Sequence, residues 1–539
     1  MSDNRTRVVF ILIVACSLLG VALMVYSTTW GAVITSDSVY YIGSADNLVK
    51  GVGFGLPWGS GRFLPYAGDP PFYPLLIAGL ELMGLSAVSA ARWVAVLSFG
   101  LTILAVGLLG WRASGSPGLA LALSLLVLIS AMLTDLYPRA MSEPIFFLTG
   151  LSGALWLLCY LESTRLSDLL LASVLLSAAF LTRYMGVALL LAGGICLITM
   201  TRLSWRTRLG HAALLTAVTC LPMVGWLAWT YTQTGMLGER SLRSGVNLWQ
   251  ATGNFRLAFA DILWSWLPFS ASIPVGYNAQ KVLLGLLFLL LLVGGGVLAW
   301  RGSKSTANRS TSLSLLRWVL FFGLFAFFFS LVYALAYAFT LPTPDLNERL
   351  FSPLSIAISF IIFALLFLVA QSGPRWRALF ALPLLALALV LADNLPTQIQ
   401  SARTLHQEGS GYTSRYWRQS PVIAALMQLP PDTLVITNEA DAVLFLTGLP
   451  VVWLPDVITS QPEEAFTRFG DSPENLPEEA AFRERGAALA IFPSAARQLQ
   501  GLYGEKTAQR LETLTQGLAE FARFGPLEAV YFYRPEFIP

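Results

Sequence analysis

The chain has 539 residues, of which 55% are hydrophobic and only 12% are charged, with a mean hydropathy of +0.65 and a net charge of +3. Soluble globular chains carry about 25% charged residues, so this composition indicates a polytopic membrane protein. The small net charge argues against nucleic acid as a partner, and two histidines with no CxxC pair argue against a zinc site, a disulfide framework or a Ser-His-Asp triad.

Apolar segments of about 20 residues predict membrane spans, and the chain holds about eleven of them. The first is longer than a signal-peptide core and lacks a clean cleavage site, which predicts a retained span. The segments 167–182 and 185–201 are short, so they form either two spans or one broken pair. The predicted spans are 8–28, 88–111, 116–134, 143–161, 167–182, 185–201, 209–231, 281–300, 316–341, 351–371 and 376–393.

A polar stretch rich in glycine and proline, 35–74, follows the first span. At about forty residues it is far longer than most loops, which indicates a functional segment. Its start predicts a short amphipathic helix that Thr35 or Ser36 caps, with Asp37 in the first turn and an apolar stripe at helical spacing. Such a helix belongs at a membrane surface, and Asp37 is the predicted chemical centre. The stripe consists of Tyr41, Ala45, Leu48 and Val49, and Gly51 and Gly53 end the helix.

The apolar segment 73–86 is too short for a span and contains Glu81. It predicts a membrane-surface or re-entrant helix instead of a crossing one.

The distribution of Lys and Arg among the loops predicts the orientation. With the N-terminus inside, the inner loops are basic, whereas the outer connections hold single arginines beside acids. This places 35–87, 135–142, 232–280 and 342–350 outside the membrane, and an odd number of spans also places the tail outside. The inner basic residues are Arg112, Arg165, Arg202, Arg206, Arg208, Arg301, Lys304, Arg309, Arg375 and Arg377.

The composition changes near residue 396, which predicts a transmembrane domain over 1–395, with 35–87 as its first outer loop, and an extracytoplasmic domain over 396–539. In the tail, short apolar strands alternate with helical stretches, which is typical of a small α/β domain. Glu439 and Asp441 are spaced like the two acids of a DxD metal-binding motif, but they are more simply explained as the acids at the start of a helix that begins at Ala440. The segments are 433–438, 440–448, 450–455, 462–486, 488–493, 494–504 and 529–535.

Charged residues near the outer ends of the spans form the candidate site, because charge close to membrane depth is costly and tends to be functional. If the spans bundle, these ends converge on one outward-facing cavity. The members are Asp37, Arg62, Asp69, Asp135, Arg139, Glu143, Arg183, Tyr184, Asp345, Glu348 and Arg349.

Several motifs in order resemble one family of membrane enzymes. An N-terminal span is followed by T-S-D-S-x-x-Y from Thr35, then A-x-N-L-x-x-G-x-G-F and P-P-x-Y-P. R-A-M-S-E-P-I-F-F (139–147), L-T-R-Y-x-G (181–186), N-E-R-L-F-S-P (347–353) and G-Y-T-S-R-Y-W (411–417) come later. The chain resembles GT-C glycosyltransferases, and specifically the bacterial branch of family 39, which is related to protein O-mannosyltransferases and aminoarabinose transferases.

This resemblance implies an inverting transfer of a hexosyl or pentosyl group from a polyprenyl phosphate to an acceptor hydroxyl, outside the bacterial cytoplasmic membrane. It implies Asp37 as the general base, which would contribute about 10²–10⁴ in rate. Arg183, Arg349 and Arg139 are then the candidates that hold the phosphate. The candidates for contact with the acceptor are Asp69, Asp135, Glu143, Tyr184 and Glu348. The implied partners are the lipid-linked sugar, an acceptor protein, lipid or glycan, and membrane lipids.

Two positions depart from the family pattern. Many relatives carry Asp-Glu at the start of the loop, where this chain has Asp37 and Ser38, so Asp37 is the lone candidate base there. Many carry His-Pro-Pro before the surface helix, where this chain has Asp69 before two prolines. A role for that histidine therefore does not transfer, although Asp69 could bind acceptor or a cation.

Other interpretations stay open on the sequence. Asp37 and Glu143 could act only as first-turn acids of helices, and the arginines as interfacial anchors. A transporter or flippase of a lipid-linked solute is the main rival function. Gly/Pro-broken spans at matching positions in two halves of the chain would favour it, and the sequence shows no such symmetry. The third candidate function is a non-catalytic assembly subunit that keeps the GT-C scaffold. The sugar, the acceptor and the involvement of a divalent cation are undetermined.

Overall fold

The computed structural model describes residues 2–58, 62–238, 240–244, 248–267, 269–270, 279, 281–283, 309–371, 381–454, 469 and 477–539. The chain folds into two compact units. The first consists of Met1–Thr29, Ala67–Ile77 and Ser89–His406, and the second of Trp30–Tyr66, Ala78–Val88 and Gln407–Pro539. The predicted outer loop and the tail therefore contribute to the same unit.

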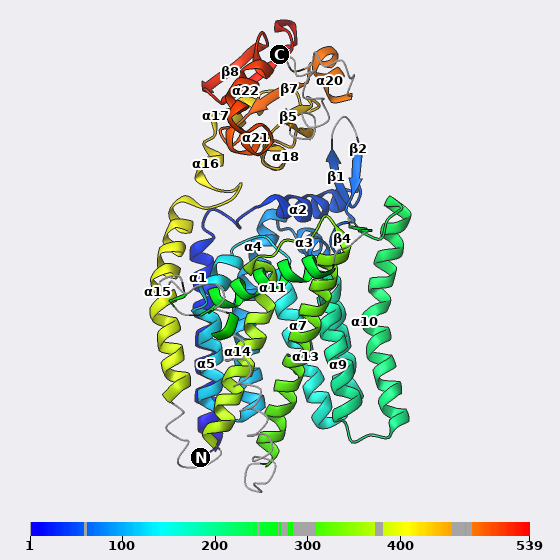
Figure 1. Cartoon of the computed structure of the whole chain (residues 1–539), viewed down its shortest axis with the longest axis vertical. Helices are drawn as coiled ribbons and strands as arrows, with labels where there is room; N and C mark the ends of the chain where they lie inside the picture. The colour runs from blue at the N-terminus through cyan, green and yellow to red at the C-terminus, as the bar shows by residue number, and fades with distance from the viewer. Residues whose placement is uncertain are drawn as a thin grey trace. The chain divides into compact units, whose positions relative to one another are not determined.

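Six helices in the described part of the chain are long and apolar enough to cross a membrane, which confirms a polytopic membrane protein. Their long axes run roughly parallel to one another in Figure 1. They are α1 (Ser2–Ser27), α4 (Ala87–Ser114), α7 (Glu143–Ser163), α10 (Trp205–Thr234), α13 (Arg309–Phe339) and α14 (Glu348–Gln371).

Shorter helices occupy several other predicted spans. The predicted span 116–134 is broken, because Ser130 accepts a hydrogen bond from Leu133 N at 3.3 Å and begins a new helix. The predicted span 281–300 lies largely outside the described residues, as does the start of 376–393. The shorter helices are α3 (Phe72–Leu82), α5 (Pro117–Leu128), α6 (Ala131–Leu136), α8 (Leu166–Thr182), η1 (Tyr184–Gly186), α9 (Val187–Met200), α11 (Leu248–Ser265) and α15 (Ala381–Glu408).

The helices of the first unit pack around one apolar core that is rich in aromatic rings. Phe351 of α14 is fully buried and meets Phe259 of α11 and Tyr333 of α13 at ring-centroid distances of 5.4 and 4.6 Å. These contacts hold the start of α14 against α11 and α13, so its first turn has a fixed place in the unit.

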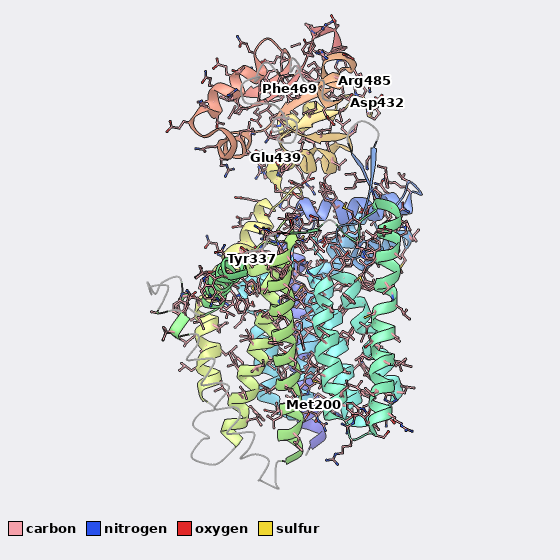
Figure 2. All side chains as sticks on the ribbon, turned by 45° about the vertical axis from the view of Figure 1, so that its right-hand side comes forward. Met200, Tyr337, Asp432, Glu439, Phe469 and Arg485 are labelled. Atoms are coloured by element: carbon pink, nitrogen blue, oxygen red, sulfur yellow. The ribbon has the colours of Figure 1, made fainter. Side chains whose placement is uncertain are left out.

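Met200, which ends α9, and Tyr337, near the end of α13, lie towards opposite ends of these helices in Figure 2. This agrees with the alternation of spans that places 201–208 and 342–350 on opposite sides. Which side is extracytoplasmic stays a prediction.

In the second unit a five-stranded sheet has the order β6-β5-β7-β9-β8. The strands β5, β6 and β7 are parallel, and β9 is antiparallel to both β7 and β8. Apolar side chains on the sheet and its helices form a separate core, which confirms the predicted α/β domain. The strands are β5 (Val435–Thr437), β6 (Val451–Trp453), β7 (Ala488–Ile491), β8 (Ala519–Gly525) and β9 (Glu528–Phe532).

Helices flank this sheet, and smaller elements complete the structure. Two short antiparallel strand pairs were not predicted: the hairpin of β1 (Gly55–Trp58) with β2 (Arg62–Pro65), and the long-range pair of β3 (Ser241–Leu242) with β4 (Thr340–Leu341). The helices of the second unit are α2 (Ser36–Val49), α16 (Arg415–Arg418), α17 (Pro421–Leu426), α18 (Ala440–Thr447), α20 (Pro477–Arg485), α21 (Ala495–Tyr503), η5 (Gly504–Lys506), α22 (Thr507–Thr515) and η6 (Pro535–Phe537).

Candidate active site

Glu143 is the most buried of the candidate acids, with only 1% of its side chain exposed. It is the first residue of α7 and precedes Pro144. Proline suits the first helical turn, because the N–H groups of that turn have no partner within the helix and proline lacks one. The positive end of the helix dipole favours a carboxylate at this position. Such deep burial of a charge still requires a cation, because an unpaired buried carboxylate costs several kcal/mol.

Arg183 supplies one of those cations. Its Nη1 lies 3.0 Å from Glu143 Oε1 and donates to Ser142 Oγ, also at 3.0 Å. The residue has an extended backbone between α8 and η1, and its carbonyl accepts from Gly186 N at 2.8 Å. This break in the helix turns the guanidinium towards the start of α7, while 20% of the side chain stays exposed.

Arg349 approaches the same carboxylate from the first turn of α14, with Nε at 3.6 Å from Glu143 Oε1. Asn347 begins this helix, since its Oδ1 accepts from Leu350 N at 3.0 Å. The Arg349 side chain is 30% exposed. One carboxylate between two guanidinium groups leaves a local charge of +1, and both arginines keep an exposed part that an anion can reach.

A third arginine belongs to this neighbourhood and was missed in the sequence. Arg240 donates to the carbonyl of Pro342, next to the paired strands β3 and β4. Arg183, Arg240 and Arg349 all act electrostatically on the hydroxyl of Tyr333, which donates to the Asp345 carbonyl. The polar connection 232–280 contained Arg240 but no motif around it, so only the fold identifies it.

The other predicted residues of the first unit lie in less enclosed positions. Arg139 Nη2 pairs with Asp135 at 2.6 Å across one helical turn, and both side chains are substantially exposed. Glu348 is exposed at the start of α14, and Asp69 is exposed in the bend before α3. Tyr184 is half-buried in η1, directly after Arg183.

A narrow apolar cavity of about 20 Å³ lies one to two turns beyond the cluster. Phe146 and Phe147 of α7 line it on one side, and Pro353 and Ile356 of α14 on another. The charged cluster therefore gives way directly to an apolar wall between α7, α13 and α14.

Asp37 belongs to the second unit, where it is exposed in the first turn of α2. The predicted cap is confirmed: Thr35 precedes the helix, and its backbone N donates to Ser38 Oγ at 3.0 Å. Tyr41 and Ala45 of the predicted stripe are buried, whereas Leu48 is 37% exposed, so the first half of the stripe holds the helix in place. Asp37 can therefore act as a solvent-accessible carboxylate on a rigid element.

Two of the candidate acids already have cationic partners within the protein. Arginines hold both Glu143 and Asp135. Among the described residues, no group of three or more His, Cys, Asp or Glu side chains is placed to hold a metal ion.

Gly186→Ala is expected to disturb the turn that carries Arg183. A Cβ at this position would lie 2.5 Å from the Phe180 Cα, and backbone atoms cannot move aside. Overpacking of this kind costs about 1–3 kcal/mol. The expected result is a lower melting temperature in detergent. Gly194→Ala in α9 is the matched control, because a Cβ there meets no atom within 4 Å. Equal melting temperatures for the two variants would contradict the tight turn.

Comparisons with known proteins give a fold but no sequence family. No family model matches the chain, and no curated protein matches it. The crystal structure of apo ArnT from Cupriavidus metallidurans aligns with a TM-score of 0.53 at 16% identity, over 98% of each chain. A crystal structure of ArnT bound to undecaprenyl phosphate aligns at 0.46 and 15% identity, again over 98% of each chain. The oligosaccharyltransferase of Archaeoglobus fulgidus aligns at 0.46 and 13% identity, over 98% of this chain and 75% of that one. The chain thus shares a fold with ArnT, as a polytopic membrane protein with a carboxy-terminal sheet domain.

Proposed function

We propose that this protein is an inverting glycosyltransferase that moves a hexosyl or pentosyl group from a polyprenyl phosphate to an acceptor hydroxyl outside the cytoplasmic membrane. The observation that carries the proposal is the pair of partly exposed arginines on the buried Glu143. The GT-C fold shared with ArnT and the order of motifs around Asp37 support it.

The phosphate of the donor is the proposed ligand of Arg183 and Arg349. When the bond between the anomeric carbon and the phosphate oxygen breaks, the phosphate keeps the electron pair and gains negative charge. Guanidinium groups stabilise that charge with charge-assisted hydrogen bonds. Glu143 holds both groups in place and neutralises only one of them. A net charge of +1 favours an incoming anion without making the pocket strongly cationic. Arg240 lies close enough to contribute a third positive charge.

The carrier's hydrocarbon chain is proposed to lie against the apolar wall beyond this cluster. The wall begins one to two turns from Glu143 and Arg349, but its cavity of about 20 Å³ is smaller than one isoprenoid unit, so α7, α13 and α14 would have to separate to admit the tail. Burial of each CH₂ group there contributes about 0.8 kcal/mol.

Asp37 is the proposed general base. Its carboxylate takes the proton of the acceptor hydroxyl as that oxygen attacks the anomeric carbon. The bond from the anomeric carbon to the phosphate oxygen breaks on the opposite face, and its electron pair leaves with the polyprenyl phosphate. The configuration at the anomeric carbon is therefore inverted. An exposed acid in the first turn of α2 is accessible to an acceptor from solution.

A donor panel tests the proposed function and separates it from a flippase. Membranes that contain the protein would receive undecaprenyl phosphate carrying tritiated glucose, mannose, galactose, arabinose or aminoarabinose. We expect one donor to release undecaprenyl phosphate while its label enters a new product. Label that crosses the membrane on intact donor would support a flippase instead. A panel in which every donor stays intact, in membranes supplied with cell-envelope extract as acceptor, would contradict the transferase.

The proposed orientation is testable with reporters. Alkaline phosphatase fused after Pro539 is expected to be active, because the tail is proposed to be extracytoplasmic. The same reporter inserted after Arg202, in a predicted inner loop, is the control and should be inactive. Activity of the second fusion and not of the first would reverse the proposed topology.

A further inference from the structure

The segment 409–418 of the tail, here termed the strap, lies along the chain that leads into α2. Tyr412 N donates to the Ile34 carbonyl at 2.9 Å, and Ile34 and Gly411 form a parallel β-bridge. Thr413 Oγ1 donates to the Ala32 carbonyl at 2.6 Å. The strap thus forms hydrogen bonds with main-chain carbonyl groups just before Asp37, although more than 370 residues separate the partners in sequence.

Arg418 fastens the other end of the strap. Its Nη2 donates to the Trp30 carbonyl at 2.8 Å, and its guanidinium lies over the Trp30 ring at 5.5 Å. Its Nε donates to Thr413 O at 3.1 Å, so the same side chain ties the strap to itself. These contacts fix the entry to α2 at several points.

Gly411 allows the close approach. Its φ of +61° is unfavourable for other residues, and a Cβ would lie 2.1 Å from the Ile34 carbonyl oxygen. A side chain here would therefore push the strap off the segment that precedes Asp37.

A chain of side-chain hydrogen bonds runs from the strap to the first turn of α2. Tyr412 Oη lies 3.2 Å from Ser36 Oγ, and Ser36 also hydrogen-bonds to the Asp441 carboxyl group. Either hydroxyl can donate in the contact between Tyr412 and Ser36. Burial, with the charges of Asp441 and Glu439, raises the pKa of Tyr412 to about 12, which keeps it a donor at neutral pH.

A separate network fixes Asp441. It lies in the first turn of α18, immediately after β5. Asn438 is 1% exposed, donates to Ser494 Oγ at 2.9 Å and accepts from Phe492 N at 2.9 Å. Ser494 in turn donates to Glu439. The carboxyl ends of the parallel strands therefore hold the start of α18, and α18 presents Asp441 to Ser36.

We propose that Tyr412 and Asp441 are positioning residues that hold the Ser36–Asp37 turn of α2 in a single orientation for proton transfer. The inference rests on the proposed role of Asp37 as the base. Asp441 also acts on Asp37 as a like charge, which disfavours a turn of the Asp37 carboxylate towards α18. The sheet domain would then act directly on turnover.

Turnover with the donor identified by the panel tests this role. Tyr412→Phe is expected to lower kcat about 3- to 10-fold, the range for one neutral hydrogen bond, with the donor KM within twofold. Tyr416→Phe is the matched control, because Tyr416 is exposed on α16. Ser36→Ala should resemble Tyr412→Phe, whereas Ser36→Thr keeps a hydroxyl and should recover part of the rate. The double variant Tyr412→Phe/Ser36→Ala should be no slower than Ser36→Ala alone, because both act through one chain.

Asp441→Asn provides a second perturbation on the other side of Ser36. It is expected to lower kcat by a similar factor while the donor KM stays within twofold. Asp432→Asn is its control. Asp432 lies before β5, whereas Glu439, two residues before Asp441, lies after it, so the two acids mark opposite ends of the same strand (Figure 2). Equal kcat values for Asp441→Asn and Asp432→Asn would overturn the role of Asp441.

Hydrogen exchange on the full-length protein tests the strap without a substrate. Peptides that cover 30–42 are expected to exchange about tenfold faster in Gly411→Val, and less so in Tyr412→Phe, than in the wild type. Unchanged exchange in both variants, or an unchanged kcat in Tyr412→Phe, would overturn the positioning role while wild-type transfer stands. A wild type that transfers no sugar would instead overturn the proposed function, whatever the exchange shows.

Discussion

Asp37→Asn is expected to lower sugar transfer by about 10²- to 10⁴-fold, because the amide cannot accept the proton of the acceptor hydroxyl. The substitution keeps the size of the side chain. It removes only a first-turn charge of α2, which costs about 0.3–1 kcal/mol of helix stability. The measurement is the initial rate of release of undecaprenyl phosphate from the active donor, in vesicles with equal amounts of protein.

Asp46→Asn is the matched control for this experiment, since Asp46 lies on the same helix and pairs with Lys50 at the surface. Its rate should match the wild type. Binding of undecaprenyl phosphate should be the same in Asp37→Asn and the wild type, because the base is not a proposed phosphate ligand. Turnover by Asp37→Asn within threefold of the wild type would exclude Asp37 as the base and leave the fold assignment untouched.

Arg183→Ala and Arg349→Ala are each expected to weaken binding of undecaprenyl phosphate about 10- to 150-fold, the equivalent of 1.5–3 kcal/mol for a hydrogen bond to a charged group. Each substitution removes one of the two guanidinium groups that flank Glu143 and so lowers the local charge by one. Lysine variants keep the charge but lose the planar fork, so they should bind with intermediate affinity. Binding of the free phospholipid to purified protein in detergent is the measurement.

Two further variants make the result specific. Arg112→Ala removes an exposed arginine that pairs with Glu162 at 3.1 Å, and its binding should equal that of the wild type. Glu143→Gln raises the local charge to +2, so it should retain phosphate binding even if it lowers thermal stability. Wild-type affinity in both Arg183→Ala and Arg349→Ala would contradict the phosphate role, and loss of binding in Glu143→Gln alone would indicate a purely structural cluster.

Local patterns predicted the elements that depend on neighbours in sequence. The cap at Thr35 and the apolar residues Tyr41 and Ala45 define α2 within a few turns, because capping and helical spacing are short-range effects. Short apolar runs predicted the strands at 435–437 and 488–491 for the same reason. The strand β8 was missed, since Ala519–Gly525 mixes charged and apolar residues and lies at the sheet edge, paired with β9 alone.

Composition and local patterns alone predicted a polytopic membrane chain, an α/β tail, and Asp37, Glu143, Arg183 and Arg349 as candidate site residues. It could not rank Arg139 against Arg183, because each is a single arginine near an acid in a predicted outer connection. Only the tertiary structure decided that Arg183 and Arg349 share the buried carboxylate of Glu143, whereas Arg139 pairs at the surface. It also shows that Arg240 acts on the Tyr333 hydroxyl together with Arg183 and Arg349, and that Tyr412 and Asp441 reach Ser36. The physical reason is distance along the chain: periodicity and capping act over a few residues, whereas these charges and hydrogen bonds form only after helices and strands far apart in sequence pack together.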